Sequence, residues 1–127
     1  MSYIILVTVA LLIQYTYFSM SAGMERVKGD IKAPATTGDE TFERKLRVQM
    51  NTLEQLIITI PAMWICGIYF RADVAAILGL IFLVGRFMYS AAYINDPASR
   101  SKGMIIGFLA NMALLVCCLI TAISHLF

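Results

Sequence analysis

Charged and polar residues recur at helical spacing in two apolar stretches of the sequence. The first set is Arg44, Arg47, Asn51 and Glu54, and the second is Arg86, Tyr89 and Tyr93. Residues three or four positions apart share a helix face, so each set is expected to form one polar stripe. Guanidinium groups bind carboxylates through paired N–H donors, and tyrosine adds hydroxyl donors. These residue types predict a site for a negatively charged ligand.

The two stripes are expected at a similar depth along their helices. Glu54 lies about 10 Å along the helix axis from Arg47, and Arg86 lies about 12 Å from the helix end at Ile94. We therefore expect Glu54 and Arg86 to pair, because neither charge is tolerated alone against lipid. Glu54 is then the only buried acid, whereas four arginines are expected on the cytoplasmic half of the molecule: Arg26, Arg47, Arg86 and Arg100. This surplus of cations predicts a ligand with carboxylates or several negative charges.

The composition places these stripes in a membrane protein. Of the 127 residues, 60% are hydrophobic and 14% are charged, against about 45–50% and about 25% in soluble domains. A soluble chain this short could not bury so much apolar surface. The net charge of +2 gives no reason to expect a nucleic-acid partner. Cys66, Cys117 and Cys118 lie in apolar runs without metal-ligand spacing, so no metal site is expected.

Four apolar stretches are long enough to cross a bilayer, which requires about 20 residues each. They cover residues 3–24, 46–70, 74–94 and 103–127. We therefore expect a single all-α domain, an integral membrane four-helix bundle. Eight of the ten Lys and Arg residues lie in the first and third loops with their helix ends, whereas only Arg71 lies on the opposite side. This asymmetry predicts cytoplasmic first and third loops, with both termini on the other side.

Other polar and small residues suggest helix packing instead of chemistry. Gln14 is expected to form a hydrogen bond between helices. Gly103 and Gly107 are four residues apart, which is compatible with close helix packing or with a flexible helix start. Ser101 has the residue type of a helix cap. The polar stripes themselves could also be interhelical hydrogen-bonding groups, with Arg44 and Arg47 anchoring a helix end in the headgroups.

The chain resembles the MAPEG family, the membrane-associated proteins in eicosanoid and glutathione metabolism. The resemblance is carried by the run from Phe42 to Glu54, whose core is Arg47-x-Gln49-x-Asn51-x-x-Glu54. It continues through Gly85-Arg86-Phe87-Met88-Tyr89, Tyr93 and Arg100 and covers nearly the whole chain. One departure is Gln55, where one branch of the family has a tyrosine directly after the glutamate of the motif.

The resemblance implies a homotrimer with glutathione bound between subunits near the cytoplasmic face. The positions that match the glutathione-binding residues of the family are Arg26, Arg47, Asn51, Glu54, Arg86, Tyr89 and Tyr93. Arg100 matches the arginine thought to stabilise the thiolate. The implied activity is conjugation of glutathione to hydrophobic electrophiles that approach from the lipid, or peroxidase reduction of lipid hydroperoxides. The short termini resemble those of bacterial members, which implies a bacterial inner membrane.

Two other functions remain open from the sequence. The family includes a lipid-binding scaffold without enzymatic activity, which the arginines at positions 47, 86 and 100 disfavour. Small multidrug transporters also have four spans and one buried glutamate. Their glutamate usually lies in the first helix, whereas here that helix is uncharged and Glu54 has arginine neighbours.

Overall fold

Four long helices account for most of the chain in the computed structural model, which describes residues 1–127. They are α1 (Ser2–Lys28), α2 (Glu40–Tyr69), α3 (Ala72–Asn95) and α4 (Ser101–Leu126), with a short 3₁₀ helix, η1 (Pro97–Ser99), before α4. All four are long and apolar enough to cross a membrane, as expected from the sequence. Most helices extend beyond the expected spans; α2, for example, begins at Glu40 and not at Leu46.

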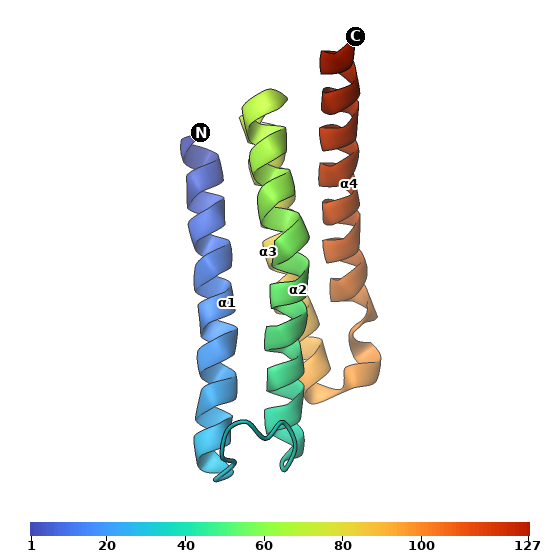
Figure 1. Ribbon diagram of the computed structural model, residues 1–127. Coiled ribbons are helices and arrows are strands. Elements are labelled where there is room, and N and C mark those ends of the chain that lie inside the picture. Colours follow the sequence, from blue (N-terminus) through green and yellow to red (C-terminus); the bar gives the residue numbers. More distant parts are fainter.

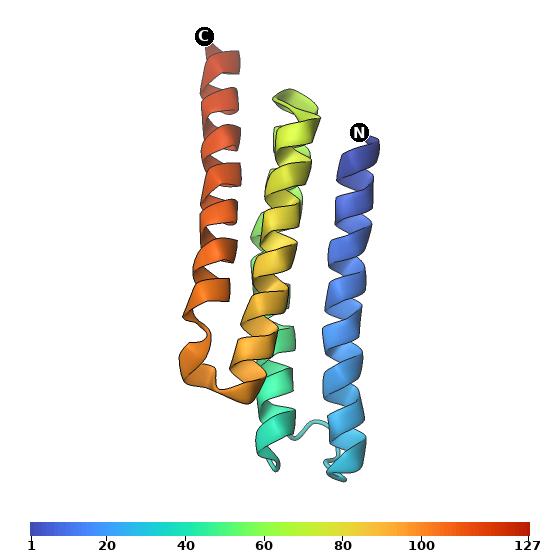
Figure 2. The ribbon, with the colours of Figure 1, turned by 180° about the vertical axis from the view of Figure 1, so that it is seen from behind.

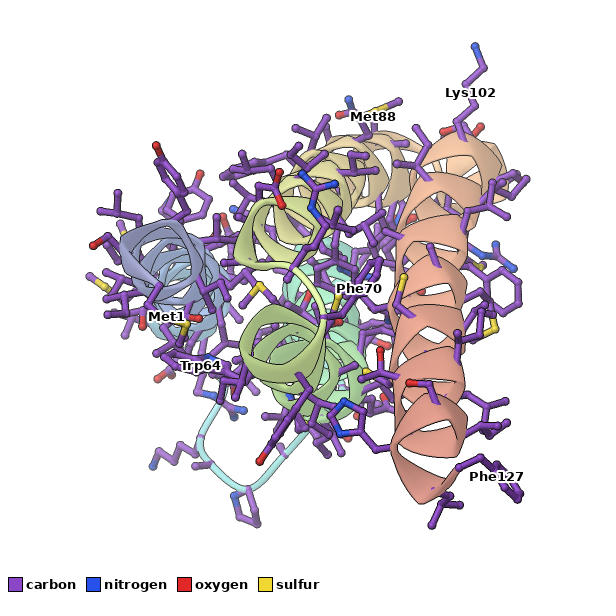
Figure 3. The ribbon with its side chains drawn as sticks, turned by 90° about the horizontal axis from the view of Figure 1, so that it is seen from above. Met1, Trp64, Phe70, Met88, Lys102 and Phe127 are labelled. Carbon is purple, nitrogen blue, oxygen red and sulfur yellow. The ribbon has the colours of Figure 1, made fainter.

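The helices run side by side with alternating direction (Figure 1). Both termini and the turn between α2 and α3 lie at one end of the molecule. The loop between α1 and α2 and the loop between α3 and α4 lie at the other end, as the view from behind also shows (Figure 2). Viewed along the helices, α1 and α4 lie on opposite sides of the α2–α3 pair (Figure 3).

Local hydrogen bonds fix the helix ends at the loop-bearing end. Asp39 caps α2, because its carboxylate accepts a hydrogen bond from the backbone N–H of Phe42 at 2.9 Å. Arg44 donates to the backbone carbonyls of Ile94 and Asn95 at 2.9 and 3.1 Å, and so satisfies the C-terminal carbonyls of α3. Helix α4 begins at Ser101 without a side-chain cap, so the expected cap there is wrong.

The core consists of apolar side chains from all four helices, among them Ile4, Met63, Phe82 and Leu114. Polar side chains within it hydrogen-bond between helices. Gln14 donates to the backbone carbonyl of Leu83 at 2.9 Å, which confirms the role expected for it. A second, smaller cluster of Phe18, Val48 and Tyr89 lies toward the loop-bearing end.

Helices α3 and α4 approach each other so closely that their backbones touch. A Cβ atom on Gly103 would lie 2.3 Å from the backbone nitrogen of Tyr89 and 2.7 Å from the carbonyl oxygen of Gly85. Only glycine fits at this position, so Gly103 is a packing residue and not a flexible helix start. Gly107 is different, because a Cβ there would make an ordinary contact of 3.6 Å with Phe82. The close pair is therefore Gly103 with Gly85 of α3, which sequence spacing alone could not identify.

Candidate functional site

Arg86 is the most deeply placed cation of the molecule. It projects from the buried face of α3 and is only 3% exposed. One terminal nitrogen donates to the hydroxyl of Thr52 on α2 at 2.8 Å. Its guanidinium carbon lies 4.3 Å from the centre of the Tyr89 ring, a cation–π contact. The Nε atom is buried without a hydrogen-bond partner.

The expected pair between Arg86 and Glu54 does not form, and this prediction is wrong within the chain. Glu54 instead lies 3.4 Å from Arg47, and its side chain is 57% exposed. The reason is geometric: Thr52 and Glu54 are two positions apart, so they point to roughly opposite sides of α2. On α2, the side chain that contacts Arg86 of α3 is Thr52. Glu54 is therefore not the buried acid that the sequence suggested.

None of the five ion pairs of the chain involves Arg86. A buried guanidinium without a carboxylate is energetically costly, because desolvation of the charge is not repaid by a neutral hydroxyl. An anion that reached Arg86 would supply the missing attraction. Thr52 was not identified from the sequence. Its polar side chain, its depth close to that of Arg86 and its position next to Asn51 could have identified it as a partner of Arg86.

The two tyrosines expected in the site lie together on α3. Their rings stack with centroids 5.5 Å apart. Tyr89 is buried against Phe18 and Val48, whereas Tyr93 is partly buried at the edge of the same cluster. The polar stripe expected on α3, from Arg86 through Tyr89 to Tyr93, is therefore continuous.

A cavity of about 560 Å³ opens between α2 and the end of the α3 stripe, where Tyr93 lines it but Arg86 and Tyr89 do not. Arg44, Arg47 and Met50 contribute to its α2 side, and Tyr93 contributes from α3. Thr36 of the first loop, with Glu40 and Glu43, reaches its outer edge. The cavity thus combines cationic, hydroxyl and acidic groups, which suits a ligand that carries charges of both signs.

The remaining site residues are not brought into contact with this group within one chain. Arg26, near the end of α1, donates to the backbone carbonyl of Ala35 at 2.8 Å and lies over the Phe42 ring. Arg100, between η1 and α4, donates to the carbonyl of Pro97 at 2.7 Å. Asn51 is half-buried on α2. Arg26 and Arg100 lie at the loop-bearing end, but their side chains are held by their own loops.

Metal-ligating side chains and cysteines are two further residue classes that can carry chemistry. No three His, Cys, Asp or Glu side chains are grouped so that they could hold a metal ion. The three cysteines are free thiols.

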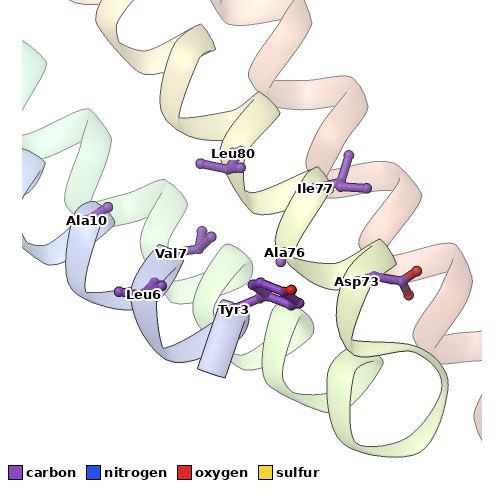
Figure 4. A pocket seen from close by; sticks show the side chains of 8 residues that line it. All are labelled: Tyr3, Leu6, Val7, Ala10, Asp73, Ala76, Ile77 and Leu80. Carbon is purple, nitrogen blue, oxygen red and sulfur yellow. The ribbon is translucent and has the colours of Figure 1, made fainter. Parts of the chain in front are cut away.

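A groove of about 540 Å³ lies between α1 and α3, toward the terminus-bearing end (Figure 4). Seven of its eight lining residues are hydrophobic, and they include Leu6, Val7 and Ile77. Asp73, its only charged residue, is paired with Arg71 at 2.6 Å. The groove therefore presents an apolar surface with no reactive group.

Comparison with known proteins finds relatives that cover most of this chain. The MAPEG family model matches residues 4–120. An uncharacterized protein of the cyanobacterium Synechocystis is 40% identical over 121 residues, which cover 95% of this chain and 88% of that protein. Human microsomal glutathione S-transferase 2 is 36% identical over 104 residues, or 80% of this chain and 71% of the enzyme. Guinea-pig leukotriene C4 synthase is 30% identical over 123 residues, or 95% of this chain and 82% of the synthase.

The family match extends over nearly the whole chain and includes all four helices. Together with the apolar character of those helices, it identifies an integral membrane protein. The chain belongs to the MAPEG family.

Proposed function

We propose that this protein is a glutathione-dependent membrane transferase that joins the glutathione sulfur to hydrophobic electrophiles, or uses glutathione to reduce hydrophobic hydroperoxides. Relatives named as a glutathione S-transferase and a leukotriene C4 synthase, at 30% identity or more, support this activity class. The single observation that carries the proposal is Arg86, a buried guanidinium that stacks on Tyr89 and has no carboxylate partner.

Glutathione carries charged groups that complement those of the site. Its two carboxylates suit the guanidinium groups, and we assign them to Arg26, Arg47 and Arg86. Its ammonium group suits Glu54, which is exposed and only loosely held by Arg47 at 3.4 Å. Asn51, Tyr89 and Tyr93 would supply neutral hydrogen bonds around the peptide groups.

Arg100 is the proposed catalytic residue. A free thiol is mostly protonated at neutral pH, and the thiolate is the nucleophile. A guanidinium beside the sulfur favours the charged form and lowers the thiol pKa. The thiolate then attacks the electrophilic carbon of the substrate, and the leaving group departs with the bonding electron pair. In the peroxidase reaction, two glutathione thiols are oxidised to one glutathione disulfide, and the two electrons and two protons that they supply convert the hydroperoxide to an alcohol and water.

We further propose that the site is completed between subunits of a homotrimer at the cytoplasmic face. The proposed ligand-binding residues Arg47 and Glu54 are exposed on a membrane-spanning helix, which is unfavourable unless another subunit or a ligand covers them. Arg26 and Arg100 are separated from Arg86 within one chain, which also favours a site shared by neighbours. The excess of Lys and Arg in the first and third loops supports their cytoplasmic location.

The proposal is tested by glutathione conjugation of chlorodinitrobenzene with the detergent-purified protein. Arg100→Ala is compared with Arg71→Ala, because Arg71 is an equally charged residue at the opposite end of the molecule. We expect Arg100→Ala to lower turnover by at least tenfold and to change the glutathione Kd by only a few-fold, whereas Arg71→Ala should leave both unchanged.

Calorimetric glutathione binding separates the outcomes. A loss of affinity as large as the loss of turnover would mean that Arg100 acts by binding glutathione and not by stabilising the thiolate. Binding without conjugation, followed by activity with cumene hydroperoxide, would assign the peroxidase reaction. Absence of both binding and turnover in the folded protein would refute the proposed function.

A further inference from the structure

A second charged group, made of residues other than those assigned to glutathione, lies at the loop-bearing end. Glu25 near the end of α1 contacts two lysines through the same carboxylate oxygen. Lys45 of α2 lies 2.9 Å from that oxygen, and Lys28 lies 3.7 Å from it. Two ammonium groups therefore share one carboxylate, which leaves one positive charge uncompensated. None of these three residues has a role in the proposed reaction.

A groove of about 370 Å³ leads from this group along the bundle between α1 and α2. On α1 it is lined by Tyr17, Met20, Ser21 and Met24, which recur at helical spacing ahead of Lys28. Tyr17, Met20 and Met24 are all about 60% exposed, so this wall faces outward. A smaller cavity of about 90 Å³ shares Tyr17, Ser21 and Lys45 with the groove and continues inward to Val48 and Ile94.

The groove is mostly apolar along α1 and charged at one end, so it matches an amphiphilic ligand. Its wall on α1 extends about 16 Å from Tyr17 to Lys28, and about the first 10 Å of this, from Tyr17 to Met24, is mostly apolar. The lysines lie where α1 leaves the apolar span, which is the level of lipid headgroups. An occupant therefore needs an apolar chain and a single negative charge at one end.

We propose that the α1–α2 groove is a binding site for an anionic phospholipid. The phosphate lies between Lys28 and Lys45, and one acyl chain lies along Tyr17, Met20 and Met24. A phosphodiester carries one negative charge, which matches the surplus charge of the Glu25–Lys28–Lys45 group. The surrounding leaflet supplies this amphiphile directly, and lysines near the membrane surface attract anionic lipids. The inference is independent of the proposed glutathione chemistry.

Native mass spectrometry of the purified full-length protein tests the site. The protein is mixed with equal amounts of phosphatidylglycerol and phosphatidylcholine that carry identical acyl chains. One net positive charge near a membrane surface contributes about 1 kcal/mol to attraction of an anionic lipid, equivalent to a preference of about fivefold. We therefore expect about five phosphatidylglycerol adducts for each phosphatidylcholine adduct.

Three variants distinguish this site from general attraction to a basic surface. Lys28→Gln with Lys45→Gln should abolish or reverse the preference, because Glu25 then remains as an unpaired negative charge. Lys32→Gln with Lys102→Gln removes one exposed lysine of the first loop and one in the first turn of α4, and changes the net charge equally, so it should retain the preference. Glu25→Gln leaves both lysines and should increase the preference, which a variant that merely unfolds would not do.

The proposal is overturned if the wild-type protein binds the two lipids equally, or if both double variants lose the preference to the same extent. Glycerol phosphate at millimolar concentration serves as a headgroup without chains. Displacement of the lipid by this probe as effectively as by an equal concentration of phosphatidylglycerol would show that the acyl chain contributes nothing, and would refute the lipid site. Weaker displacement or none, with the preference retained, would support binding through both headgroup and chain.

Discussion

The backbone contact between α3 and α4 can be tested by a single methyl group. In Gly103→Ala, the new Cβ would lie 2.3 Å from the Tyr89 nitrogen and 2.7 Å from the Gly85 carbonyl oxygen. Both neighbours are backbone atoms, so no side-chain rotation can relieve the clash. The helices would have to separate by about 1 Å to restore ordinary contact, and overpacking of this kind costs about 1–3 kcal/mol.

The chain contains a matched control for this substitution. Gly23 lies on the exposed surface of α1, and a Cβ there would meet no atom within 4 Å. Alanine is a better helix former than glycine by about 0.8–1.0 kcal/mol, so Gly23→Ala should stabilise the protein. The two substitutions add the same methyl group to a helix but should change the free energy of unfolding in opposite directions.

Thermal unfolding in detergent measures both effects. At about 4 °C for each kcal/mol, Gly103→Ala should lower Tm by about 4–12 °C, whereas Gly23→Ala should raise it slightly. Gly107→Ala, whose Cβ would lie 3.6 Å from the Phe82 ring, should resemble Gly23→Ala. Since Gly103 contacts the backbone of Tyr89, Gly103→Ala should also weaken glutathione binding. A Tm for Gly103→Ala equal to that for Gly23→Ala would refute the close approach.

Three further substitutions test individual hydrogen bonds. Thr52→Val removes the hydroxyl that accepts a hydrogen bond from Arg86. It should lower the free energy of unfolding by about 1–3 kcal/mol, measured as a lower Tm, and should weaken glutathione binding, measured by calorimetry. An unchanged Tm would contradict this contact. Asp39→Ala removes the cap of α2 and should cost about 1 kcal/mol without changing glutathione affinity, whereas Asp39→Ser should retain most of the stability. Asn111→Leu removes the acceptor of the Thr59 hydroxyl at 2.7 Å and the donor to the Gln55 side chain at 3.2 Å, and should cost about 0.6–1.7 kcal/mol for each bond in SDS-induced unfolding. A loss larger than the two bonds together would mean that Asn111 has a further role.

The sequence predicted the helices well because their signal is local. Length and apolar character define a membrane-spanning helix without reference to its neighbours. The helix ends were placed less well, since they depend on caps and contacts such as Asp39 with Phe42 and Arg44 with the end of α3. Gln14 was interpreted correctly because a polar side chain in an apolar helix has few ways to be satisfied.

The arrangement within the site was harder to predict. Helical spacing gives the depth of a residue and the residues that share its face, but not the direction in which that face points. Glu54 and Arg86 were therefore paired by depth, although α2 directs Thr52 and not Glu54 toward α3. The prediction for Gly103 was similarly incomplete: its spacing from Gly107 suggested close helix packing, but its close partner Gly85 lies on another helix.

The position of α1 and α4 on opposite sides of the α2–α3 pair has a consequence for symmetry. Each chain presents two different lateral edges to the membrane, one formed by α1 and the other by α4. A two-fold dimer would join two copies of the same edge and leave the other edge uncovered twice. A head-to-tail contact between unlike edges instead repeats around a rotation axis and closes into a ring in which every edge is covered. The two unlike edges are therefore compatible with the head-to-tail contact that the proposed homotrimer requires.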